Sequence, residues 1–123
     1  MSNKVFFVDD DEVTLFLYKR LARKVGVEGI FCENGKVFLD KYREENSNGL
    51  VILDINMPVL NGLEVLKELD AAGEIAKVAV VAMLGSASKD EIRSQIEGFG
   101  VKQFADKPLN ETKLRELLGL DEA

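Results

Sequence analysis

The stretch Val5-Phe6-Phe7-Val8-Asp9-Asp10-Asp11 joins a continuously apolar run to three consecutive carboxylates. A short run without polar alternation is typical of a strand that is buried on both faces of a parallel sheet. Residues 50–53 form a second such run, which leads into Asp54, and residues 103–105 form a third, shortly before Lys107-Pro108. Because the carboxyl ends of parallel strands meet at one edge of an open α/β sheet, the acids and the lysine are predicted to converge there.

Clustered carboxylates repel one another unless a divalent cation or an ammonium group compensates their charge. A hard cation and a lysine around one aspartate are suited to handling a phosphoryl group. We therefore interpret this edge of the sheet as a phosphoryl-transfer site.

The rest of the chain alternates between strand and helix patterns. Strands are predicted over residues 4–8, 29–32, 50–54, 78–84 and 101–105. Helices are predicted over residues 11–25, 34–45, 63–72, 88–99 and 110–118. Such alternation implies parallel βαβ crossovers and an α/β fold with a doubly wound sheet covered by helices on both faces.

The helix predicted at residues 11–25 carries most of its apolar residues at helical spacing. Its expected buried face consists of Thr14, Leu17, Tyr18, Leu21 and Val25. At 100° per residue, Phe16 falls nearly opposite this face and is expected to be exposed. The basic residues of the same helix, Lys19, Arg20, Arg23 and Lys24, are interpreted as an ordinary solvated surface.

Composition narrows the class of protein. The 123 residues fit one domain, 1–123, and no effector domain is expected. The formal net charge of −6 argues against a surface that binds nucleic acid or an anionic membrane. No apolar run approaches the roughly 20 residues that span a bilayer, so a cytoplasmic location is predicted. The single cysteine, Cys32, cannot pair within the chain and is expected to be a small core residue.

On residues 5–11, 51–62 and 100–108, the sequence resembles the receiver domain of bacterial two-component response regulators. The resemblance extends over essentially the whole chain. It implies a flavodoxin-like fold with the five parallel strands in the order 2-1-3-4-5. It also implies that Asp54 is phosphorylated by a histidine kinase or a histidine phosphotransfer protein.

The resemblance assigns roles at the predicted site. Asp54 lies on the middle strand of that order and is the expected nucleophile and phosphoacceptor. Asp10 and, partly through water, Asp9 would hold Mg²⁺ together with Asp54 and the backbone carbonyl of Asn56. Lys107 would pair with Asp54 and then with the phosphoryl oxygens. Asp11 is instead predicted to cap the helix that follows it.

One position departs from the family pattern. Receivers normally carry Thr or Ser at the end of the fourth strand, where this chain has Gly85, followed by Ser86. Either Ser86 supplies the hydroxyl that bonds the phosphoryl group, or the backbone N–H acts alone. Phe104 matches the aromatic switch of the family. The implied output surface for a downstream protein surrounds it on the fourth helix, fifth strand and fifth helix.

The start of the first helix is the expected surface for the phosphodonor. In receivers, this surface and the loop at the Lys-Pro pair dock the phosphohistidine helix bundle. Val13, Phe16 and Pro108 are therefore predicted to contact the donor.

Two other interpretations remain open at this stage. Residues 9–13 also fit the D-x-D-x-[TV] motif of haloacid-dehalogenase-like phosphatases, with Asp9 as nucleophile, although this leaves Asp54 unexplained and the chain is short for that fold. Alternatively, Gly85 could mark a degenerate receiver that binds partners without being phosphorylated.

Overall fold

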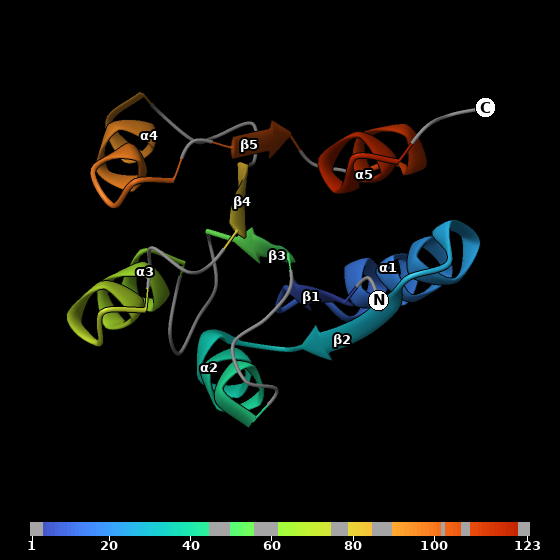
Figure 1. The fold of residues 1–123 in the computed structure, drawn as a ribbon, viewed down its shortest axis with the longest axis horizontal. Coiled ribbons are helices and arrows are strands. Elements are labelled where there is room, and N and C mark those ends of the chain that lie inside the picture. The colour runs from blue at the N-terminus through green and yellow to red at the C-terminus, as the bar shows by residue number, and fades with distance from the viewer. Residues whose placement is uncertain are drawn as a thin grey trace.

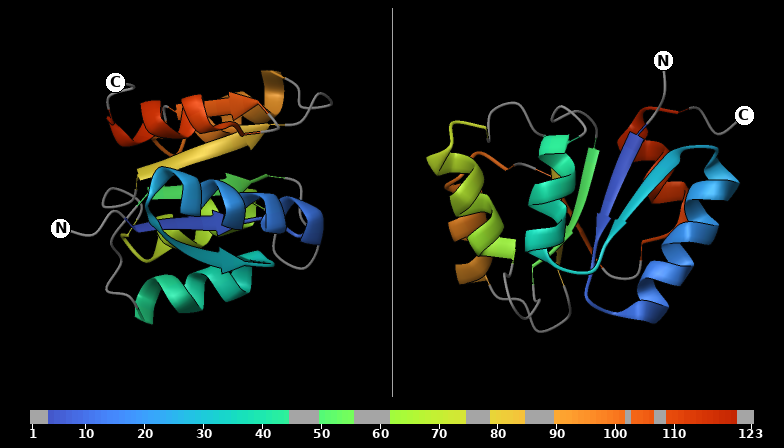
Figure 2. Two further views of the ribbon diagram at one scale, coloured as in Figure 1. Left: turned by 90° about the vertical axis from the view of Figure 1, so that its right-hand side faces the viewer. Right: turned by 90° about the horizontal axis from the view of Figure 1, so that it is seen from below.

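The computed structural model describes residues 4–44, 50–55, 62–74, 79–84, 90–101, 103–106 and 109–120. The strands are β1 (Lys4–Val8), β2 (Glu28–Cys32), β3 (Leu50–Asp54), β4 (Ala79–Leu84) and β5 (Gln103–Asp106). They form one five-stranded parallel sheet in the order β2-β1-β3-β4-β5, which confirms the predicted flavodoxin-like topology. Figure 2 shows the strands pointing in the same direction, so their carboxyl ends share one edge.

Helices cover both faces of this sheet, as the alternation predicted. They are α1 (Glu12–Val25), α2 (Gly35–Glu44), α3 (Gly62–Ala71), α4 (Asp90–Glu97) and α5 (Glu111–Leu118). Helices α1 and α5 lie on one side and α2, α3 and α4 on the other (Figure 1). The predicted boundaries agree to within about two residues. Within the described residues, no helix combines the length and apolar character required to cross a membrane.

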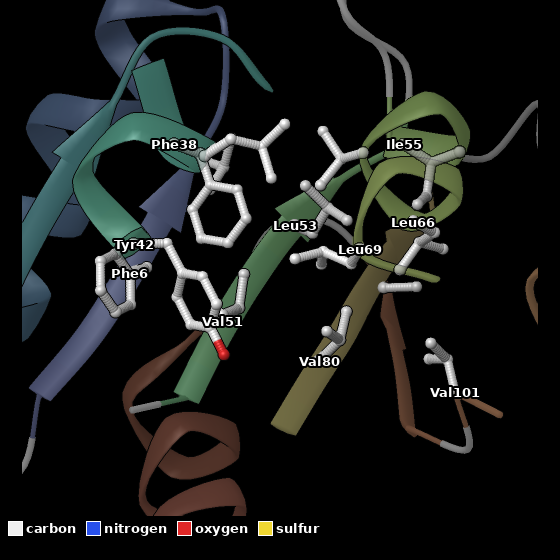
Figure 3. Packing of buried hydrophobic residues seen from close by; sticks show 14 of the residues in the cluster. Phe6, Phe38, Tyr42, Val51, Leu53, Ile55, Leu66, Leu69, Val80 and Val101 are labelled. Carbon is white, nitrogen blue, oxygen red and sulfur yellow. The ribbon is translucent and has the colours of Figure 1, made fainter. Parts of the chain in front are cut away.

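Each face of the sheet carries its own apolar core, because successive side chains of a strand point to opposite sides. In β1, Phe6 and Val8 join the core under α2, α3 and α4, whereas Val5 and Phe7 join the core under α1 and α5. The first core contains three aromatic rings in edge-to-face or tilted contact, from Phe6, Phe38 and Tyr42 (Figure 3). Val8 and Leu53, both in the first core, directly precede Asp9 and Asp54 in the chain.

The buried face of α1 differs from the prediction at Leu17. The side chains buried most deeply are Tyr18 and Ala22, four residues apart, while Leu17 is largely exposed. The prediction was wrong because 100° per residue places Leu17 about a quarter turn away from Tyr18, at the edge of the packed face. The expected exposure of Phe16 is confirmed.

Candidate functional site

Two carboxylates are buried side by side at the carboxyl edge. Asp9 follows β1 and Asp54 ends β3, and the register of these strands pairs Val8 with Leu53. The exposed fraction is 0% for Asp9 and 2% for Asp54, and these are the buried charged side chains among the described residues. Burying carboxylates is costly without compensating cations or hydrogen bonds, so their concentration here marks a functional site.

Asp10 completes a three-carboxylate cluster. One carboxylate oxygen from each of Asp9, Asp10 and Asp54 lies within 4.8 Å of the others. Asp10 is exposed, so the cluster is reached by solvent from its side. Carboxylate oxygens at this spacing suit a hard divalent cation that retains several of its waters. The prediction that these three acids converge is confirmed, and the donor set is compatible with a divalent metal ion.

Backbone hydrogen bonds hold Asp9 in place. Its N–H donates to the carbonyl oxygen of Cys32 at 3.1 Å, which extends the pairing of β1 with β2 beyond the strand. Its Oδ1 accepts from the N–H of Asp11 at 2.9 Å. Asp11 in turn is the N-cap of α1 and accepts from the N–H and the hydroxyl of Thr14. The prediction that Asp11 caps the helix that follows it is therefore confirmed.

The start of α3 packs directly against the end of β3. The N–H of Gly62 donates to the carbonyl oxygen of Ile55 at 3.1 Å. A Cβ atom on Gly62 would come within 2.7 Å of Ile55 Cα and 2.9 Å of the Asp54 carbonyl oxygen. Only glycine fits here without displacing the backbone next to Asp54. The sequence alone does not reveal this requirement, because the close approach joins the end of β3 to the start of α3, and no local pattern indicates that contact.

Tyr18 is a second feature that the sequence did not connect to the site. Its ring packs on Phe7 with centroids 4.8 Å apart. Burial, together with the negative charges of Asp9 and Asp54, raises the pKa of the Tyr18 phenol far above its ordinary value. The phenol therefore remains neutral beside the acidic cluster throughout the physiological pH range.

The aromatic ring of Phe104 on β5 is half-buried. The guanidinium carbon of Arg93, on α4, lies 4.4 Å from the ring centroid, in a cation–π arrangement. Arg93 was not identified from the sequence, because its contact with β5 depends on the tertiary arrangement. The contact ties α4 to the strand that carries the predicted switch residue.

Five predicted site residues lie outside the described residues: Asn56, Gly85, Ser86, Lys107 and Pro108. Their roles stay predictions. The two docking residues predicted on α1, Val13 and Phe16, are both described and both exposed.

Comparison with known proteins agrees with this geometry. A sequence profile described as the response regulator receiver domain matches residues 5–119. The chain is 31% identical to two-component response regulator 24 of Arabidopsis thaliana, over 90% of this chain and 78% of that protein. It is 30% identical to the polar-differentiation response regulator DivK of Brucella anthropi, over 96% of this chain and 94% of that protein.

Solved structures show the same fold. A response regulator receiver protein from Pseudomonas putida superposes with a TM-score of 0.86 at 22% identity, covering 97% of both chains. The chemotaxis protein CheY4 of Vibrio cholerae gives a TM-score of 0.84 at 22% identity, covering 97% of this chain and 98% of that chain.

The parallel sheet with an acidic cluster at its carboxyl edge, the profile match and these relatives together define a class of phosphoacceptor signalling domains. The chain belongs to the response regulator receiver domain family of two-component systems. This family consists of signalling domains rather than classical enzymes, which disfavours the phosphatase interpretation of Asp9.

Proposed function

We propose that Asp54 is the phosphoacceptor of this receiver and that it takes the phosphoryl group from a phosphohistidine of a histidine kinase or histidine phosphotransfer protein. The observation that supports this most directly is the burial of Asp54 at the end of the central strand, with oxygens of Asp9 and Asp10 within 4.8 Å. An Asp54 oxygen forms the new P–O bond while the P–N bond to the donor imidazole breaks and its electron pair stays on nitrogen.

The acidic cluster fits Mg²⁺ as its cofactor. Mg²⁺ prefers one or two carboxylates, several waters and the phosphate itself, and this matches a cluster that is open on the side of Asp10. When bound, the metal neutralises the charge of the acids and of the incoming phosphoryl group. Asp10 and Asp54 would bind it directly, Asp9 would act partly through water, and the Asn56 carbonyl would be the last protein ligand. Lys107 pairs with the phosphoryl oxygens.

Phosphorylation then changes partner binding in the cytoplasm. Gly85 or Ser86 contacts the phosphoryl group, and Phe104 transmits the change to a downstream protein on the face formed by α4, β5 and α5. The contact between Arg93 and Phe104 supports a link between α4 and β5 on this face. Val13 and Phe16, together with Pro108, dock the phosphodonor.

Acetyl phosphate with Mg²⁺, followed by intact-mass measurement, tests this function without a protein donor. The wild-type chain is expected to gain one phosphoryl group, and chelation of the metal or Asp54→Asn is expected to abolish the gain. Asp40→Asn is a matched control, because Asp40 is an exposed aspartate on α2. Labelling of the Asp54→Asn variant at the wild-type level would refute the assignment. No labelling of the wild type would favour a degenerate receiver, and a phosphoaspartate at Asp9 would favour the phosphatase.

A further inference from the structure

Tyr18 lies on the same face of the sheet as the two buried carboxylates. Its exposed fraction is 3%, and its ring centroid lies 4.8 Å from that of Phe7. Phe7 precedes Asp9 by two residues, and the hydrogen bond from the Asp9 N–H to Cys32 continues the strand pairing through Asp9. Side chains two residues apart in a strand share a face and stand about 7 Å apart. Tyr18 therefore packs against the neighbour of Asp9 on this face.

The same relationship holds for Asp54 at the end of β3. Ile52 precedes Asp54 by two residues, pairs with Phe7 across the sheet and belongs to the same core as Tyr18. The apolar layer that contains Tyr18 therefore lies beneath both carboxylates, on the side of the sheet that α1 and α5 cover.

The direction of α1 brings the Tyr18 hydroxyl toward these acids. The helix begins at Glu12, directly after the three aspartates, and runs back along the sheet, so its N-terminus lies at the carboxyl edge (Figure 2). Tyr18 lies about 9 Å further along the helix axis than Glu12. Because helical side chains tilt toward the helix N-terminus, the phenol extends back toward the acids. The ring thus stays on Phe7 while the hydroxyl approaches Asp9 and Asp54.

Packing alone does not account for this hydroxyl. A phenylalanine would make the same contact with Phe7, and a buried tyrosine hydroxyl usually has a hydrogen-bond partner. Within the described part of the chain, the Tyr18 hydroxyl makes no hydrogen bond. Burial and the charges of Asp9 and Asp54 raise the pKa of the phenol, so the group keeps its proton at neutral pH. A hydroxyl hydrogen rotates to suit its surroundings, so beside two carboxylates its positive end turns toward them.

We propose that Tyr18 is a positioning residue of the phosphoacceptor site, whose hydroxyl turns its hydrogen toward the Asp9 and Asp54 carboxylates and stabilises negative charge there. The inference rests on the proposed function for one point, that Asp54 accepts the phosphoryl group. The hydroxyl gives no proton and forms no bond in the transfer, because it acts through the two carboxylates. A dipole that is already oriented in a buried site needs little reorganisation when charge develops.

Phosphoryl transfer is expected to make this contribution larger. The arriving phosphoryl group adds negative charge beside Asp54, so the O–H dipole stabilises the transition state more than it stabilises the resting carboxylates. An interaction that strengthens in the transition state raises the maximal rate rather than the affinity for the donor. Tyr18 should therefore affect the maximal rate of labelling and leave the half-maximal concentration of acetyl phosphate almost unchanged.

Two tyrosine-to-phenylalanine variants form a matched pair. Tyr18→Phe removes one hydroxyl and keeps the ring on Phe7. Tyr42→Phe removes the other tyrosine hydroxyl of the chain, from the core on the opposite face of the sheet (Figure 3). Labelling by acetyl phosphate is followed by intact mass at saturating Mg²⁺ over a range of donor concentrations. Tyr18→Phe is expected to lower the maximal rate roughly five- to ten-fold, and Tyr42→Phe less than about two-fold.

Tyrosine labelled with ¹³C at Cζ reports on the hydroxyl itself. The full chain contains two tyrosines, so its NMR spectrum has two such signals, and each variant assigns one of them. The chemical shift of this carbon responds to the hydrogen bonding of the attached oxygen. Mg²⁺ and acetyl phosphate are therefore expected to shift the Tyr18 signal more than the Tyr42 signal. Urea denaturation of both variants shows whether a change in rate merely follows a change in stability.

The possible outcomes separate this inference from the proposed function. The inference is wrong if Tyr18→Phe is labelled like the wild type, if both variants are slowed alike, or if the Tyr18 signal does not move. A change confined to the half-maximal donor concentration would also overturn it, because the hydroxyl would then act on donor binding. A wild type that is not labelled refutes the proposed function and this inference with it. A labelled wild type that Tyr18→Phe matches in rate refutes the inference alone.

Discussion

The carboxylate of Asp9 and the backbone of Asp11 are joined by a hydrogen bond of 2.9 Å between Asp9 Oδ1 and Asp11 N. The donor is a main-chain N–H, so the bond persists whatever side chain residue 11 carries. The Asp11 carboxylate faces the helix, where it accepts from Thr14 Oγ1 at 2.7 Å. Asp11 therefore orients the Asp9 carboxylate through its backbone N–H, and it caps α1 through its side chain.

This separation predicts opposite phenotypes for neighbouring aspartates. Asp10→Ala removes a carboxylate of the cluster and is expected to weaken Mg²⁺ binding strongly. Asp11→Ala is expected to leave Mg²⁺ affinity almost unchanged, while it lowers the free energy of unfolding by about 1 kcal/mol through loss of the helix cap. Titration of the metal and urea denaturation measure the two effects. Comparable losses of metal affinity in both variants would contradict the assignment.

The strand ends were predictable from the sequence because buried parallel strands form continuous apolar runs, and Asp9 and Asp54 follow two of them directly. The strand order could be taken only from the family resemblance, since no pairing is encoded in a single run. The role of Asp11 followed from its place before an amphipathic segment. The strand ends and the cap at Asp11 are local features, so local sequence patterns could predict them, whereas the strand order is not.

The features that the sequence did not reveal all depend on contacts between distant elements. Arg93 covers Phe104 because α4 packs beside β5, and no spacing rule relates these two residues. Leu17 was placed on the buried face because its spacing from Leu21 is helical. The width of that face depends on how closely α5 approaches α1, which the pattern does not specify. Periodicity gives the direction of a face, and tertiary packing gives its limits.

Gly62 offers a test of packing against β3, the strand that ends at Asp54. Gly62→Ala would place a Cβ atom 2.9 Å from the Asp54 carbonyl oxygen, so the backbone must shift. The variant is expected to lose about 1–3 kcal/mol of unfolding free energy and to accept phosphate from acetyl phosphate more slowly.

Gly26→Ala is the matched control for Gly62→Ala. A Cβ at Gly26 meets nothing within 4 Å, but its φ of +86° disfavours alanine. Its expected cost is about 1 kcal/mol. No change in the rate of phosphorylation is expected, because Gly26 lies between the end of α1 and the start of β2, whereas Asp54 lies at the carboxyl end of β3. If both variants slowed phosphorylation equally, the effect would reflect stability rather than the close contact at Asp54.

Cys32 is predicted to be inert in the folded chain. Burial raises the pKa of its thiol to about 12, against a weaker opposing effect of Lys41. At pH 8, a thiol-reactive reagent should modify the unfolded chain and leave the folded chain unmodified. Because the folded pKa lies above the unfolded value of about 8.5, this group contributes its stability fully below pH 8.5 and loses it as the pH rises toward 12. Rapid modification under native conditions would show that β2 opens.

The last prediction distinguishes docking of the donor from the chemistry of the acceptor. Phe16 is 58% exposed on α1, so its truncation leaves the core intact, and Phe16→Ala should change the free energy of unfolding little. Loss of an aromatic anchor is nevertheless expected to slow phosphotransfer from the cognate phosphohistidine protein about ten-fold. Acetyl phosphate needs no docking surface, so it should label the variant at the wild-type rate. Lys67→Ala, an exposed change on α3 across the sheet, is the control for the donor reaction. Equal slowing with both phosphodonors would make Phe16 a structural residue and exclude it from the docking surface.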